Sequence, residues 1–107
     1  MKKDKSFIRF KKTILIKGEE YTIKQVAKLK DDDGVEVDGL HDHIEKTISL
    51  NKNQTPKAKR TTFLHEFYHA YLYECHLREG LDSQMEEAIV EACSQATERH
   101  FDLTWKK

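Results

Sequence analysis

Two histidines flank a glutamate near the middle of the chain, in the run His65-Glu66-Phe67-Tyr68-His69, which has the pattern HExxH. Each residue turns an α-helix by about 100°, so both imidazoles would lie on one helical face and could reach one Zn²⁺ ion. Glu66 would lie beside that ion, where its carboxylate can take a proton from a metal-bound water and pass it to a leaving amine. The same pattern also occurs by chance on unrelated helices. Its interpretation as a metal site therefore depends on a surrounding helix and on a third ligand.

Three glutamates further along the chain are candidates for the third ligand, since a catalytic zinc ion usually has three protein ligands and an open position for water. Glu86, Glu87 and Glu91 lie 17, 18 and 22 residues after His69. Glu87 and Glu91 are one turn apart and share a helical face, whereas Glu86 points elsewhere. We favour Glu87 as the ligand and keep Glu91 and Glu86 as alternatives. The second glutamate of the pair would accept a hydrogen bond from the far nitrogen of a ligand histidine.

Other histidines are weaker candidates for metal binding. His76 lies eleven residues after His65, which corresponds to about 16 Å along a helix axis and is too far to share one ion. His41 and His43 flank Asp42 and could form a second cluster, but neighbouring turn residues of this kind are usually solvated. We therefore expect one metal site in the chain.

A long helix is expected around the HExxH pattern. Thr55 suits an N-cap and Pro56 suits the first helical position, while Gly80 is a typical residue after a helix end. These signals predict a helix over 56–79. Its expected apolar face consists of Phe63, Phe67, Ala70, Tyr71 and Leu77.

A second helix should return toward the first one. Ser83 and Glu86 match the capping box S-x-x-E, which predicts a helix start at Ser83 and a helix that runs to about residue 100. Its small apolar face would let another helix approach closely. This face consists of Met85, Ala88, Ile89, Ala92, Cys93 and Ala96.

The part of the chain before residue 55 alternates β-forming and polar residues, which predicts short strands. We expect them near 7–10, 13–16, 21–29, 35–37 and 47–50, with turns at 17–20, 31–34 and 38–39. The sequence thus predicts an α+β fold with a small, mostly antiparallel sheet followed by two helices. One domain should span residues 1–107, with the sheet over about 7–50 and the metal-binding helices over about 56–100.

Size and charge narrow the possible functions. The chain has 107 residues and a mass of 12.6 kDa, and its 19 basic residues balance 19 acidic ones. No stretch approaches the roughly 18 apolar residues of a membrane span, and the basic N-terminus lacks the apolar segment of a secretory signal. We therefore expect a cytoplasmic protein with no membrane partner. The basic residues Lys52, Lys57, Lys59 and Arg60 read as a solvated helix start, so nucleic acid is not an expected partner.

Two stretches resemble the ImmA/IrrE-type gluzincins, a class of small HExxH zinc metallopeptidases with phage-borne relatives. Residues 61–70, TTFLHEFYHA, are similar to the TLLHExxHA segment of that class, and residues 86–92, EEAIVEA, are similar to its E-A-x-x-x-A segment. Residues 39–50 also resemble the glycine and edge strand that precede the metal helix there. The resemblance covers about residues 39–100, and its HExxH part is the more specific.

The resemblance implies a minimal zincin-like domain with His65, His69 and Glu87 as Zn²⁺ ligands and Glu66 as general base. The chain is expected to depart from the family pattern in two respects. We expect no helix ahead of the sheet and no separate C-terminal sensor or DNA-binding domain.

The resulting hypothesis is a zinc-dependent endopeptidase that acts on a protein or peptide, for which a repressor-like regulator is one candidate. An extended substrate would pair with the strand over 47–50, which we expect at the sheet edge. The oxyanion could be stabilised by Tyr68, Tyr71, Tyr73 or His76. The alternative is a non-catalytic zinc-binding regulatory or interaction protein, because a small core gains stability from a structural metal. The presence of Glu66 favours the enzyme, since a structural site needs no carboxylate between its histidines.

Overall fold

A computed structural model describes residues 12–101 and has the expected α+β fold, with one four-stranded sheet and two helices. The predicted strand over 7–10 lies outside the described residues. In chain order the elements are β1 (Thr13–Ile16), β2 (Glu19–Val26), β3 (Gly39–Asp42), β4 (Thr47–Asn51), α1 (Pro56–Glu74), a short 3₁₀ turn (Arg78–Gly80) and α2 (Ser83–His100).

The sheet has the strand order β1-β2-β4-β3. The β1–β2 and β3–β4 pairs are antiparallel, whereas β2 and β4 run parallel. Two of the three pairings therefore agree with a mostly antiparallel sheet. The prediction that residues 47–50 form an edge is wrong, because β4 lies inside the sheet and β3 forms the edge. Ile48 and Leu50 of β4 are completely buried, which suits a strand with a neighbour on each side.

The segment between β2 and β3 is a loop rather than the expected strand over 35–37. The turn over 31–34 is confirmed: the Asp31 carboxylate accepts hydrogen bonds from the backbone N–H groups of Asp33 and Val35, and Gly34 has a φ of 79°. The only β-pairing within this loop is an isolated bridge between Lys30 and Glu36. Gly39 does not form the predicted third turn, since β3 begins there.

Helix α1 starts as predicted but ends five residues earlier. The Thr55 hydroxyl caps the N–H of Ala58, and Pro56 is the first helical residue. At the other end His76 has a φ of 59°, its N–H bonds to the Tyr73 carbonyl, and the next N–H bonds to the Leu72 carbonyl. These two bonds form a Schellman motif, which ends a helix through a left-handed residue. The helix therefore stops before Gly80.

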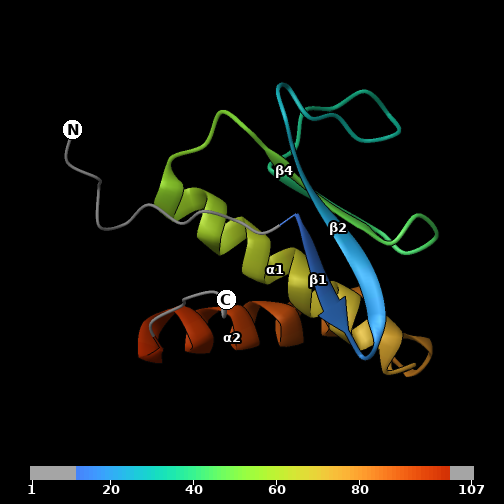
Figure 1. The fold of residues 1–107 in the computed structure, drawn as a ribbon. Helices are drawn as coiled ribbons and strands as arrows, with labels where there is room; N and C mark the ends of the chain where they lie inside the picture. The colour runs from blue at the N-terminus through green and yellow to red at the C-terminus, as the bar shows by residue number, and fades with distance from the viewer. Residues whose placement is uncertain (1–11, 102–107) are drawn as a thin grey trace.

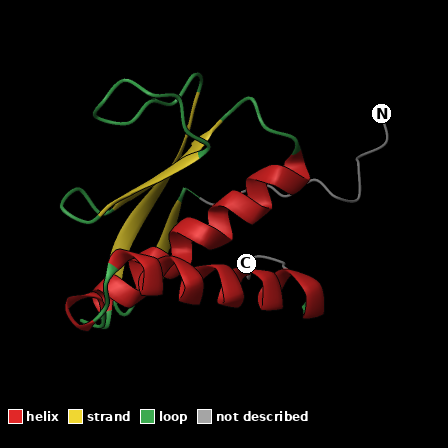
Figure 2. Cartoon of the chain, turned by 180° about the vertical axis from the view of Figure 1, so that it is seen from behind, coloured by secondary structure: helices red, strands yellow, loops and turns green. Residues whose placement is uncertain are grey.

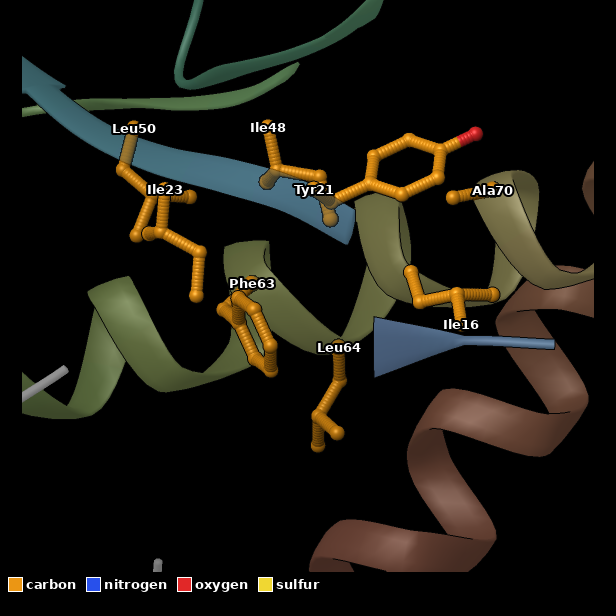
Figure 3. Close-up of a cluster of buried hydrophobic side chains, with 8 residues drawn as sticks. All are labelled: Ile16, Tyr21, Ile23, Ile48, Leu50, Phe63, Leu64 and Ala70. Carbon is orange, nitrogen blue, oxygen red and sulfur yellow. The ribbon is translucent and has the colours of Figure 1, made fainter. Parts of the chain in front are cut away.

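Helix α1 lies between the sheet and α2, so the molecule has three layers (Figure 1, Figure 2). The buried core between sheet and α1 is shown in Figure 3 and consists of Ile16, Tyr21, Ile23, Ile48, Leu50, Phe63, Leu64 and Ala70. The expected apolar face of α1 is partly confirmed. Phe67 packs against this core as predicted, whereas Tyr71 and Leu77 are 39% and 54% exposed.

Helix α2 packs on α1 through a different face from the one predicted. Its buried residues are Glu86, Val90 and Ser94, while Met85 is 55% exposed. Ser94 bonds its hydroxyl to the carbonyl of Val90, which allows its burial. The helix begins at Ser83 as predicted, but its cap is Asp82, whose carboxylate accepts the N–H of Met85. Within residues 12–101, neither helix is long and apolar enough to cross a bilayer.

Candidate metal centre

The two histidines of the HExxH pattern point their Nε2 atoms at each other across one turn of α1. These atoms are 3.2 Å apart. The Glu87 carboxylate of α2 faces both of them, with one oxygen 3.2 Å from His65 Nε2 and the other 2.9 Å from His69 Nε2. His65, His69 and Glu87 are the one group of three such residues in the described chain whose ligand atoms all lie within 4.8 Å of one another.

This donor set fits a zinc ion. Ligand atoms at about 2.0–2.1 Å from a tetrahedral centre are separated from each other by about 3.3 Å. The two histidine nitrogens are 3.2 Å apart, and each has a different oxygen of Glu87 within 3.2 Å. Two imidazoles and one carboxylate form the ligand set of many catalytic zinc sites, which keep a fourth position open. Glu87, the predicted third ligand, lies with the two histidines in a group that could hold a metal ion.

Glu86 holds His69 in the orientation that a metal ligand requires. One Glu86 oxygen lies 2.6 Å from His69 Nδ1, and the other accepts a hydrogen bond of 3.0 Å from Arg78 Nε. Burial alone would raise the pKa of Glu86, but the hydrogen bonds from His69 and Arg78 lower it, so the carboxylate stays charged. A charged Glu86 keeps the proton of His69 on Nδ1 and leaves Nε2 free for a metal.

The prediction that Glu86 points elsewhere is therefore wrong. Glu86 and Glu87 are about 100° apart on α2, and His69 lies between them because α2 packs close to α1 at this turn. Glu91 has a comparable but looser position: its carboxylate is 3.5 Å from His65 Nδ1. The two glutamates that flank Glu87 thus each face one of the ligand histidines.

Glu66 lies on the side of the centre that faces β3. The strand comes so close to α1 here that a Cβ atom on Gly39 would lie 2.5 Å from Thr62 Cγ2 and 3.1 Å from Glu66 Cγ. Burial raises the pKa of Glu66 to about 7, with the charge of Glu87 adding to the effect and His65 opposing it. A divalent cation nearby would lower this value. Glu66 is therefore a half-buried carboxylate beside the candidate metal centre, and its pKa depends on whether a metal is bound.

Two cavities meet at the centre. One, of about 340 Å³, is lined by Asp38, Gly39, Thr61, Thr62, His65, Glu66 and Glu91. The other, of about 440 Å³, is lined by Leu40, His41, His43, Glu66, His69, Arg78, Ser83, Glu86 and Glu87. Both contain Glu66, so together they form a cleft with the metal centre at its middle and β3 along one wall.

His41 is a cleft residue that the sequence did not single out as such. Its Nε2 is 3.4 Å from the hydroxyl of Tyr21, which donates a 2.5 Å hydrogen bond to Glu74. Glu74 also accepts a 2.5 Å hydrogen bond from Lys46. Burial lowers the pKa of His41 to about 4, helped by the charge of Arg78, so its imidazole is neutral at pH 7. The alternation of β3 could have indicated that His41 shares a strand face with Gly39.

The residues suggested for the oxyanion take other positions. The Tyr68 hydroxyl lies 2.5 Å from Thr97 Oγ1, and Tyr71 is exposed on the surface. Tyr73 and His76 line a neighbouring cavity together with Arg78. The cavity that contains Glu66 and His69 holds His41 and Arg78 instead.

Comparison with protein-family models, curated proteins and solved structures finds no match for the chain.

Proposed function

We propose that the protein is a zinc-dependent endopeptidase of the gluzincin type, as its resemblance to the ImmA/IrrE class implies. One observation carries the proposal: two histidine nitrogens and a glutamate carboxylate converge beside a half-buried glutamate in an open cleft. His65, His69 and Glu87 would hold the ion. A zinc ion bound there supplies a Lewis acid that lowers the pKa of water and polarises a carbonyl.

Glu66 acts as the general base in this proposal. Its carboxylate accepts a proton from the attacking water and delivers that proton to the nitrogen of the leaving amine. Glu86 and Glu91 serve the reaction indirectly by orienting His69 and His65.

The free edge of β3 offers a binding place for an extended peptide. The backbone carbonyl of Asp38 accepts a hydrogen bond from the Asn51 N–H, and Gly39 faces Leu50 in the next pair. Hydrogen-bonded and non-hydrogen-bonded pairs alternate in antiparallel strands. Gly39 and His41 therefore direct their backbone N–H and C=O groups away from β4, at the outer edge of the sheet. A peptide that pairs with them would lie across the metal centre, which supports a protein or peptide as substrate.

Metal content and peptidase activity test the proposal together. Wild-type protein should contain about one zinc ion per chain and cleave an unfolded protein such as reduced casein. Glu66→Gln should keep the zinc and lose activity by at least about 10²-fold, because the amide cannot act as a base. The double variant His65→Ala/His69→Ala should lose both. Glu20→Gln, an exposed change on β2, serves as the control.

A zinc site completed by four protein ligands, in a protein that cleaves no tested substrate, would contradict the proposal. That result would favour the alternative, a non-catalytic zinc-binding regulatory or interaction protein.

A further inference from the structure

Arg78 lies beside the candidate metal centre, and among the described residues only one of its three guanidinium nitrogens is hydrogen-bonded. Its Nε bonds to Glu86, and its guanidinium carbon lies 5.8 Å from the centre of the Tyr73 ring. The side chain is 38% exposed and lines two adjoining cavities. Within residues 12–101, its two terminal nitrogens have no hydrogen-bond partner. Arg78 therefore presents two oriented donors to whatever enters this side of the cleft.

The two ends of the cleft differ in charge. At the end near Gly39, the carboxylates of Asp38 and Glu91 are exposed, and none of the described residues that line this cavity is a lysine or an arginine. The cavity at the other end contains Arg78 together with the imidazole of His43, the hydroxyl of Ser83 and the carboxylates of Glu66, Glu86 and Glu87.

Four acidic residues line the two cavities together with Arg78: Glu66, Glu79, Glu86 and Glu87. Glu86 shares its charge between Arg78 and His69, and Glu87 faces the two histidines. Glu79 is exposed to solvent, where its charge is screened. Arg78 is the one lysine or arginine among the described residues that line these cavities, so an anionic group of a substrate would bind at its two terminal nitrogens.

The direction of β3 relates these charges to the direction of a bound peptide. The strand runs from Gly39, in the cavity with Asp38, to His41, in the cavity with Arg78. Antiparallel pairing is slightly more stable than parallel pairing. A peptide that pairs antiparallel to β3 begins at the Arg78 end and finishes at the Asp38 end.

We propose that the cleft selects extended peptide segments by the order of their charges: an acidic side chain on the amino-terminal side of the scissile bond binds Arg78, and a basic side chain on the carboxyl-terminal side faces Asp38. This inference rests on the proposed function. It assigns the substrate class of the same site and makes Arg78 a specificity-determining residue.

Two peptides of identical composition and opposite charge order test the proposal without any turnover. The probes are acetyl-EEAALAKK-amide and acetyl-KKAALAEE-amide, whose blocked ends carry no charge. Their dissociation constants are measured by calorimetry at low ionic strength with zinc-loaded Glu66→Gln protein. The first peptide should bind about fivefold to tenfold more tightly, as expected for half-exposed charge pairs.

Arg78→Gln should bring the ratio of the two dissociation constants close to one. Glutamine removes the charge but can still donate to Glu86, and a ratio within one variant cancels any general loss of metal affinity. Arg99→Gln is the matched control, because it removes the same charge at the exposed far end of α2. It should keep the wild-type preference.

Each of the other possible results overturns the inference and shows which part of it is wrong. Equal binding of both peptides contradicts charge selection and leaves peptide binding by the cleft intact. Tighter binding of the second peptide contradicts the antiparallel direction. An unchanged preference in Arg78→Gln contradicts the role of Arg78. Failure of both peptides to bind overturns the inference and also counts against a peptide substrate.

Discussion

Three glutamates on the first three turns of α2 face the two histidines of α1 in three different ways. Glu87 faces the two histidine Nε2 atoms, Glu86 bonds to Nδ1 of His69, and Glu91 lies near Nδ1 of His65. The distance and burial of each carboxylate decide its task. Glu86 is 7% exposed and close to its partner, whereas Glu91 is exposed and further away.

The loss of zinc affinity on substitution should differ among these three glutamates. Glu87→Ala should weaken zinc binding most, since it removes a ligand. Glu86→Gln should weaken it by about 10–100-fold, the usual effect of losing a partner that orients a ligand histidine. Glu91→Gln should have a smaller effect, because its contact with His65 is long and solvent-exposed. Competition titrations against a chelator give all three values, and a larger loss for Glu91→Gln than for Glu86→Gln would contradict this ranking.

The sequence could predict the donors but not the partners that orient them. His65, Glu66 and His69 follow from helical spacing, because their positions depend on one helix alone. The contact of Glu86 with His69 depends on how closely α2 approaches α1. A hydrophobic pattern predicts that Glu86 is solvated. It cannot show that a carboxylate with two charged or hydrogen-bonding partners can be buried.

At the scale of elements, the close approach of β3 to α1 brings the sheet edge to the metal centre. Gly39→Ala would place a methyl group 2.5 Å from Thr62 Cγ2 and 3.1 Å from Glu66 Cγ. This clash should lower the free energy of unfolding by about 1–3 kcal/mol. Thr62→Ser removes Cγ2 but keeps the hydroxyl that bonds to Gln54, so it should recover much of the loss.

Gly80→Ala is the matched control for this experiment, because a methyl group there meets no atom within 4 Å. Urea denaturation of the three variants and of the combined Gly39→Ala/Thr62→Ser protein provides the comparison. A Gly39→Ala protein as stable as the Gly80→Ala protein would show that β3 does not need this close approach.

Element types were more predictable than element ends and neighbours. The start of α1 follows from Thr55 and Pro56, which act locally. Its end does not, because His76 takes the left-handed position where glycine is the usual signal. The strand order depends on pairing between segments that are distant in the sequence, because β4 takes the interior place by pairing with β2 on one side and with β3 on the other.

At the scale of the whole molecule, the half-buried His41 links the cleft to global stability. Its pKa is about 4 in the folded protein, against 6.5 when it is exposed in the unfolded chain. Between these values the unfolded chain binds more protons, so the folded state loses stability as the pH falls from 6.5 to 4. After allowance for its partial exposure, this contribution is about 2 kcal/mol.

His41→Gln should remove that part of the acid sensitivity while keeping a donor for Tyr21. The free energy of unfolding of the metal-free variant, minus that of the metal-free wild type, should rise by about 2 kcal/mol between pH 7 and pH 4. His100→Gln, at the exposed end of α2, should leave the difference constant. An equal pH dependence for wild type and His41→Gln would show that His41 does not act in this way.

A crystal structure of the zinc-loaded Glu66→Gln protein, with anomalous diffraction at the zinc edge, tests the central claim most directly. The account predicts one zinc ion bound by His65 Nε2, His69 Nε2 and the Glu87 carboxylate, with a water molecule in the fourth position on the side of residue 66. A zinc ion at another place, or one whose fourth position is filled by a further protein side chain, would contradict a catalytic metal centre at this site.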